Sequence, residues 1–196
     1  MPIELIPESI RNSYEVFEWK HATSILHDDF PQEFSEVIAV LTRFVLARSD
    51  ILVPGGQKSP IANKFDSQFY EMGWEEKQMH IHIDIDGDTV HIPTHKIDCF
   101  KNRIGLEVEW NNKDPFFDRD LNNFRLLYDL NALDVGVIIT RCTNLQTIFA
   151  ALGKGASYGA STTHMEKLIP RIEGNGAGGC PVLVFGISQR LYRDDL

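Results

Sequence analysis

Residues 97–110 read IDCFKNRIGLEVEW. The apolar residues of this stretch form two short runs, for which we predict strands over 96–100 and 105–110. The polar residues 101–103 between them indicate a turn, so the two strands are expected to pair as a hairpin. Because acidic side chains interrupt both apolar runs, this hairpin is also the candidate site of the chain.

Three carboxylates lie in the hairpin, at Asp98, Glu107 and Glu109. Glu107 and Glu109 are two residues apart and project to the same face of a strand, whereas Leu106 and Val108 point into the core. If the strand of Asp98 pairs with that of Glu107, all three carboxylates converge. Like charges so close repel one another, and a hard divalent cation with oxygen ligands would offset that repulsion. Such a cation activates water and polarises a phosphoryl group, as phosphodiester hydrolysis requires.

The same alternation has a second interpretation. An amphipathic hairpin needs polar residues on its solvent face, and acidic residues at these positions satisfy that need without any chemistry. Residue spacing alone does not separate the two interpretations.

The remaining pattern predicts an α/β fold with a mixed central β-sheet flanked by helices. No repeat or linker divides the sequence, so we predict that residues 1–196 form a single domain. The apolar spacing predicts helices over 31–48, 62–72, 115–128 and 163–172, a loop over 50–60, a hairpin over 79–92 that turns at Asp86-Gly87, and buried strands over 133–140 and 181–187.

The composition is that of an acidic globular protein. The 196 residues carry a formal charge of -9, which by itself argues against a nucleic-acid ligand. However, 17 acidic and 8 basic residues precede residue 99, and 11 of each follow, so the whole excess lies in the first half. The chain has no apolar run long enough for a membrane span and no secretory segment, which predicts a cytoplasmic protein. Its three cysteines form no CxxC pair and are expected to be reduced.

The motif resembles a nuclease active site of the PD-(D/E)xK type. Asp98, followed nine residues later by Glu107-Val108-Glu109 and then by Trp110, is similar to the BglII and BstYI restriction endonucleases, which have Glu-Val-Gln and an aromatic residue at this spacing. The likeness covers most of the chain from about residue 30. It implies a restriction-endonuclease-like core and a type II enzyme that cuts double-stranded DNA.

The resemblance also implies roles for the site residues. Asp98, Glu107 and the Val108 carbonyl would hold Mg²⁺, with Mn²⁺ as a substitute, and Glu109 would position or deprotonate the attacking water. The third motif position is usually Lys or Gln in this group, and Glu109 departs from that pattern. Glu109 therefore has two candidate roles, as general base or as ligand of a second metal.

DNA contacts are implied in three places. Family members insert the segment after the motif into the DNA groove and read bases with a serine-rich loop, and a further contact comes from the following helix. The corresponding residues are Asn111, Asn112, Lys113, Arg125, Lys154, Ser157, Ser161 and Thr162. A polar turn is the simpler interpretation of the Asn-Asn pair. The glycines near Lys154 do not follow a strand, which disfavours a nucleotide-cofactor loop.

The predicted function is therefore that of a homodimeric, magnesium-dependent restriction enzyme that leaves 5'-phosphate ends. The resemblance implies a palindromic GATC-centred site and a cognate DNA methyltransferase. Two alternatives remain: a nuclease of DNA repair or degradation, and a non-catalytic DNA-binding relative. His80 and His82 share a strand face and could contribute to a transition-metal site, although the solvent face of a hairpin explains them more simply.

Overall fold

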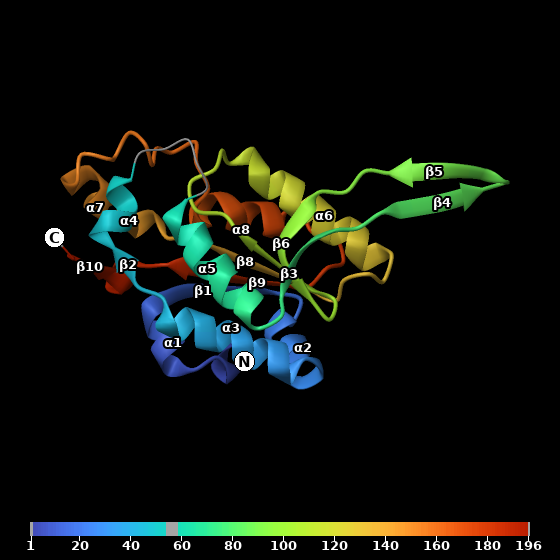
Figure 1. Ribbon diagram of the computed structural model, residues 1–196, viewed down its shortest axis with the longest axis horizontal. Helices are drawn as coiled ribbons and strands as arrows, with labels where there is room; N and C mark the ends of the chain where they lie inside the picture. Colours follow the sequence, from blue (N-terminus) through green and yellow to red (C-terminus); the bar gives the residue numbers. More distant parts are fainter. Residues whose placement is uncertain (1, 54–58, 196) are drawn as a thin grey trace.

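The computed structural model describes residues 2–53 and 59–195 (Figure 1). Its centre is a six-stranded sheet in the order β1-β9-β8-β7-β6-β3. Strands β7, β8 and β9 are parallel, and β1, β6 and β3 join antiparallel to their neighbours, which confirms the predicted mixed sheet. The strands are β1 (Tyr14–Trp19), β2 (Leu46–Ala47), β3 (Glu75–Gln78), β4 (Ile81–Ile85), β5 (Asp88–Ile92), β6 (Lys96–Lys101), β7 (Ile104–Val108), β8 (Val135–Arg141), β9 (Val182–Ile187) and β10 (Tyr192–Arg193).

Helices cover both faces of this sheet. The α-helices are α1 (Glu8–Ser13), α2 (Ala22–Asp29), α3 (Pro31–Arg43), α4 (Arg48–Leu52), α5 (Pro60–Glu71), α6 (Pro115–Asp129), α7 (Gln146–Ala151) and α8 (Met165–Glu173), with short 3-10 turns at Pro2–Leu5, Thr143–Leu145 and Gln189–Leu191. The apolar sides of α6 and α8 form one core layer, and those of α1, α2, α3, α5 and α7 form the other. Because both faces are covered, β7, β8 and β9 are buried along their whole length, as their apolar sequences predict.

Two glycines on the parallel strands β7 and β8 allow α6 to approach the sheet closely. Gly105 of β7 pairs in register with Gly136 of β8, and the ring of Phe124 from α6 lies over both. A Cβ atom at Gly136 would lie 2.3 Å from Phe124 Cδ2, and one at Gly105 would lie 3.2 Å from Phe124 Cε1. The small residues of the sheet therefore set the height of α6 above the strands that carry the candidate site.

The helix predicted over 31–48 is shorter in the structure. It ends at Arg43, and Phe44 has extended backbone angles, with φ -69° and ψ 135°. The predicted loop over 50–60 is also partly wrong, because residues 50–52 belong to helix α4; residues 54–58 lie outside the described residues. The helix predicted over 62–72 begins two residues earlier, where Ser59 Oγ caps it by accepting from Ala62 N at 3.0 Å.

The hairpin predicted over 79–92 is present as β4 and β5. Its turn residues, Asp86 and Gly87, both have positive φ, as a two-residue hairpin turn requires. The hairpin forms a sheet of its own and projects away from the rest of the protein (Figure 1). Its outer apolar residues Ile85 and Val90 are therefore exposed, and the alternation of the sequence does not correspond to a buried face here.

Candidate active site

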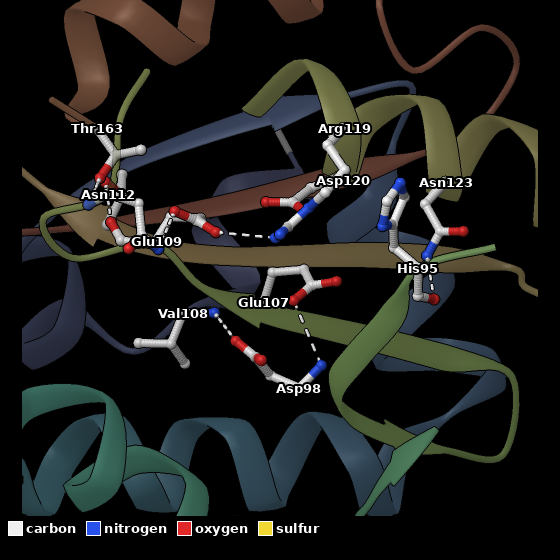
Figure 2. Close-up of polar contacts among 11 residues, drawn as sticks. His95, Asp98, Glu107, Val108, Glu109, Asn112, Arg119, Asp120, Asn123 and Thr163 are labelled. Atoms are coloured by element: carbon white, nitrogen blue, oxygen red, sulfur yellow. Dashed lines mark hydrogen bonds and ion pairs between the residues drawn. The ribbon is translucent and has the colours of Figure 1, made fainter. Parts of the chain in front are cut away.

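Asp98 and Glu107 face each other where the pairing of β6 and β7 ends. The last paired residues are Cys99 and Leu106. Beyond them, hydrogen bonds from side chain to backbone take the place of those between the two backbones. Asp98 Oδ2 accepts from the Val108 amide at 3.0 Å, and Glu107 Oε2 accepts from the Asp98 amide at 3.3 Å (Figure 2). The two acidic residues predicted from their nine-residue spacing are thus adjacent, and each is oriented by the strand of the other.

Glu107 is buried, with 1% of its surface exposed. Its Oε1 atom has no hydrogen-bond partner within the described ranges. Burial raises the pKa of Glu107 well above its usual range, and the nearby charges of Asp120 and Asp98 raise it further. A buried carboxylate with an unpaired oxygen is costly unless a positive charge approaches it.

Glu109 follows β7 and lies above Glu107 (Figure 2). Its backbone is fixed to β8, because Glu109 N donates to Ile139 O at 2.9 Å and Thr140 Oγ1 donates to Glu109 O at 2.7 Å. Its carboxylate accepts from Asn112 Nδ2 at 2.7 Å and from Arg119 Nη2 at 3.4 Å. Burial, together with the charge of Asp120, raises the pKa of Glu109 to about 9.

A further acidic residue, Asp120 of α6, lies beside Glu107 and Glu109 and was missed by the sequence analysis. It is 1% exposed, and its Oδ1 accepts from Arg119 Nε at 2.8 Å. Burial raises the pKa of Asp120, and Arg119 opposes that rise. One signal could have identified it, because Asp120 interrupts the apolar stripe that α6 buries through Phe117 and Phe124.

The residue types in this cluster suit a hard divalent cation. All of the side-chain donors are carboxylate oxygens, and Glu107 Oε1 is unpaired within the described part of the chain. In their present positions the carboxylates are held apart, Asp98 by the Val108 amide and Glu109 by Asn112 and Arg119. Consistently, among residues 2–53 and 59–195 no three acidic, histidine or cysteine side chains are close enough together to hold a metal ion.

The segment after the motif and the serine-rich loop lie against each other. Asn111 Nδ2 donates to Ser157 O at 3.2 Å, Lys113 forms a β-bridge with Thr162, and Asp114 N donates to Ser161 O at 3.0 Å. Seven of the eight residues predicted to contact DNA are therefore brought together by two segments that are about 40 residues apart in sequence.

A cleft of about 1140 Å³ joins these segments to the carboxylates. One wall includes Asp98, Val108, Asn111 and Lys154, and the other comes from α4 and α5. Asp98 thus lies at the edge of an open cleft, while Glu107 and Glu109 lie behind it. A polymer that enters the cleft would pass Asp98 and four of the predicted contact residues, Asn111, Asn112, Lys154 and Ser157.

The sequence model of the family described as restriction endonuclease BglII/BglIII matches residues 14–187. The match begins at the first residue of β1 and ends at the last residue of β9, so it spans the whole central sheet. The chain belongs to the BglII/BglIII restriction endonuclease family. No curated protein matches it.

Membership of the BglII/BglIII family implies a type II DNA endonuclease that binds double-stranded DNA. The family match also begins earlier than the likeness seen from about residue 30, because it includes β1. None of the helices in the described ranges is long and apolar enough to cross a membrane.

Three residues with a predicted DNA-contact or metal-binding role, Arg125, Thr162 and His82, do not line the cleft in the described structure. Arg125 is on the outer side of α6, 3.9 Å from Asp129, and is not among the described residues that line the cleft. The Thr162 hydroxyl is buried and accepts from Arg141 Nη2 at 2.7 Å. His82 faces His91 across the β4–β5 hairpin, with Nδ1 atoms 2.7 Å apart. That hairpin projects away from β6 and α6, which carry Asp98 and Asp120 (Figure 1).

Proposed function

We propose that this protein is a sequence-specific, metal-dependent restriction endonuclease, in which Asp98, Glu107 and the Val108 carbonyl hold Mg²⁺ or Mn²⁺. The observation that carries the proposal is the reciprocal pairing of Asp98 and Glu107 at the edge of the cleft, with Glu107 Oε1 left unpaired in the described structure. When bound, the cation supplies a Lewis acid for the scissile phosphate and lowers the pKa of a bound water.

The side chains then have separate tasks. Asp98 is held at the edge of the cleft by the Val108 amide, where its carboxylate can reach a phosphodiester. The Glu109 carboxylate is held by Asn112 Nδ2 at 2.7 Å and Arg119 Nη2 at 3.4 Å, and in its ionised form, which a bound cation would favour, it would position or deprotonate the attacking water. Asn111, Asn112 and Lys154 line the same cleft and suit base edges and phosphates.

The wider assignment extends these local arguments. Residues 1–196 would act as a single cytoplasmic endonuclease domain that works as a homodimer on a palindromic GATC-centred site, leaves 5'-phosphate ends, and is paired with a cognate methyltransferase. Two-fold protein symmetry would match the two-fold symmetry of the DNA. The supporting observation is family membership over residues 14–187.

The test is cleavage of unmethylated plasmid with Mg²⁺, followed by sequencing of the ends. Discrete fragments are expected from the wild type, and no fragments from Glu107→Ala, which should still bind duplex DNA. Glu173→Ala, an exposed glutamate at the end of α8, is the matched control and should cut normally. A smear would favour a repair or degradation nuclease, and binding without cleavage at any Mg²⁺ or Mn²⁺ concentration would favour a non-catalytic relative.

A further inference from the structure

We propose that Asp120, which lies outside the motif on α6, is a fourth carboxylate of the catalytic centre and supplies a ligand to a divalent cation there. This inference rests on the proposed function. The inference goes beyond the proposed function because the motif assigns the metal to residues of β6 and β7 alone.

Two buried carboxylate oxygens, one on Asp120 and one on Glu107, accept no hydrogen bond from the described residues. No donor group of the described residues reaches Asp120 Oδ2 or Glu107 Oε1, and both residues are 1% exposed. The Asp120 carboxyl also lies within hydrogen-bonding reach of the Glu109 carboxyl. Asp120 of α6 and Glu107 of β7 lie close enough for their charges to interact, and both belong to the cluster drawn in Figure 2. Two unpaired carboxylate oxygens from different elements at one buried place are the ligands that a hard cation takes.

The cluster around Asp120 contains more acidic than basic side chains. Glu107, Glu109 and Asp120 are buried together, and Arg119 is the one basic side chain that contacts them in the described ranges. Its guanidinium lies 2.7 Å from Asp120 Oδ1 and 3.4 Å from Glu109 Oε1, and it contacts neither of the unpaired oxygens. When these three carboxyl groups are ionised, as ligands of a metal must be, a single arginine cannot neutralise them, whereas the addition of one divalent cation would balance the charge.

Asp120 is held in place by the packing of α6 on the sheet. Phe124, one turn further along α6, packs against Gly105 and Gly136 of the sheet, so the helix sits close above β7. An aspartate has a short side chain, and this close approach is what brings its carboxylate to Glu107. The position of Asp120 is thus fixed by the core of the protein and not by a mobile surface segment.

An ordinary ion pair with Arg119 is the competing explanation, and the two predict opposite effects of Asp120→Asn on the metal-free protein. If Asp120 serves stability through Arg119, the variant should melt at a lower temperature in EDTA. If Asp120 is a metal ligand whose charge is buried beside Asp98 without its metal, removal of that charge relieves the cost of burying it, and the variant should melt at a higher temperature in EDTA.

The experiment measures melting temperature in EDTA and the affinity for Mn²⁺ by calorimetry, on the full chain without DNA. We expect Asp120→Asn to melt higher than the wild type in EDTA and to bind Mn²⁺ at least about tenfold more weakly. Asp118→Asn, an exposed aspartate two residues away that pairs with Arg171, is the matched control and should bind Mn²⁺ like the wild type.

Asp98→Asn distinguishes a failure of the Asp120 assignment from a failure of the metal site of the motif. If Asp98→Asn weakens Mn²⁺ binding and Asp120→Asn leaves it unchanged, the assignment of Asp120 is overturned and the metal site of the motif stands. If the wild type binds no Mn²⁺, both the inference and the metal-dependent function are overturned. A lower melting temperature of Asp120→Asn combined with unchanged Mn²⁺ affinity would establish the ion-pair explanation instead.

Discussion

Gly136→Ala tests whether the close approach of α6 to the sheet is a real constraint. The added Cβ would lie 2.3 Å from Cδ2 and 2.5 Å from Cε2 of Phe124, whereas carbon atoms in ordinary contact are about 3.5–4.0 Å apart. The ring must therefore retreat by more than about 1 Å. It is fully buried and also lies against Gly105, so the helix has to move with it.

The expected cost follows from two opposing effects. Overpacking of a core costs about 1–3 kcal/mol, while replacement of glycine by alanine in a strand recovers about 0.5–1 kcal/mol of backbone entropy. The clash is the larger effect, and we expect a net loss of about 1–2 kcal/mol in the free energy of unfolding. Because Asp120 moves with α6, Mn²⁺ affinity should also fall.

Urea unfolding, followed by circular dichroism, measures this loss as a lower midpoint. Gly155→Ala is the control, because its Cβ would meet no atom closer than 3.4 Å, and its midpoint should stay within error of the wild type. Phe124→Leu removes part of the ring, so the double variant should lose less stability than the two single losses added together. A Gly136→Ala protein as stable as the wild type would refute the reasoning.

Three more changes have calculable directions. In EDTA, the free energy of unfolding should fall as the pH rises from 6 to 8, because Glu107 and Glu109 have raised pKa values and keep protons that the unfolded chain releases above about pH 4.5. The slope is at most about 1.4 kcal/mol per pH unit for each group. Urea midpoints that rise with pH would contradict this prediction. Arg141→Met removes the buried guanidinium that donates to Tyr158 O and the Thr162 hydroxyl, so trypsin should cut faster at Lys154, and an unchanged rate would show that Arg141 does not hold the loop. Ser59→Ala removes the cap of α5 and should cost about 1 kcal/mol in urea unfolding, with Ser59→Gly costing only a few tenths.

Local pattern was sufficient to predict the centre of the sheet. β6 and β7 appear as apolar runs around a turn of Asn102 and Arg103, which both have positive φ, and β8 and β9 appear as continuous apolar segments. These signals are strong because the buried faces of each strand are visible in its own sequence as apolar residues.

The end of α3 could not be read from the same kind of signal. Phe44 continues the helical spacing and is buried, yet it lies beyond the helix and stacks on Phe65 with ring centroids 4.3 Å apart. Its burial comes from a partner that is distant in the sequence, and periodicity does not distinguish that case from another helical turn. β1 was not predicted for a related reason, since it pairs with β9 from the far end of the chain.

The candidate site divides in the same way. The spacing of Asp98 and Glu107 predicted their proximity, because both lie on neighbouring strands joined by a short turn. Asp120 reaches the cluster only through the packing of α6 on Gly105 and Gly136, which is a property of the whole fold. The signal available in the sequence was an acidic residue within an apolar helical stripe, which indicates a buried charge without saying what it meets.

The projecting β4–β5 hairpin offers a practical site for attaching a reporter. At its base, Thr94 Oγ1 donates to Met79 O at 2.5 Å and Gln78 Nε2 donates to Thr94 O at 3.1 Å, so the two ends are joined independently of the strands beyond them. A fluorescent protein or affinity tag inserted between Asp86 and Gly87 would sit at the tip, at the opposite end of the molecule from α4, which lines the cleft (Figure 1). Energy transfer between two labelled chains on DNA would then test the proposed homodimer without alteration of either terminus.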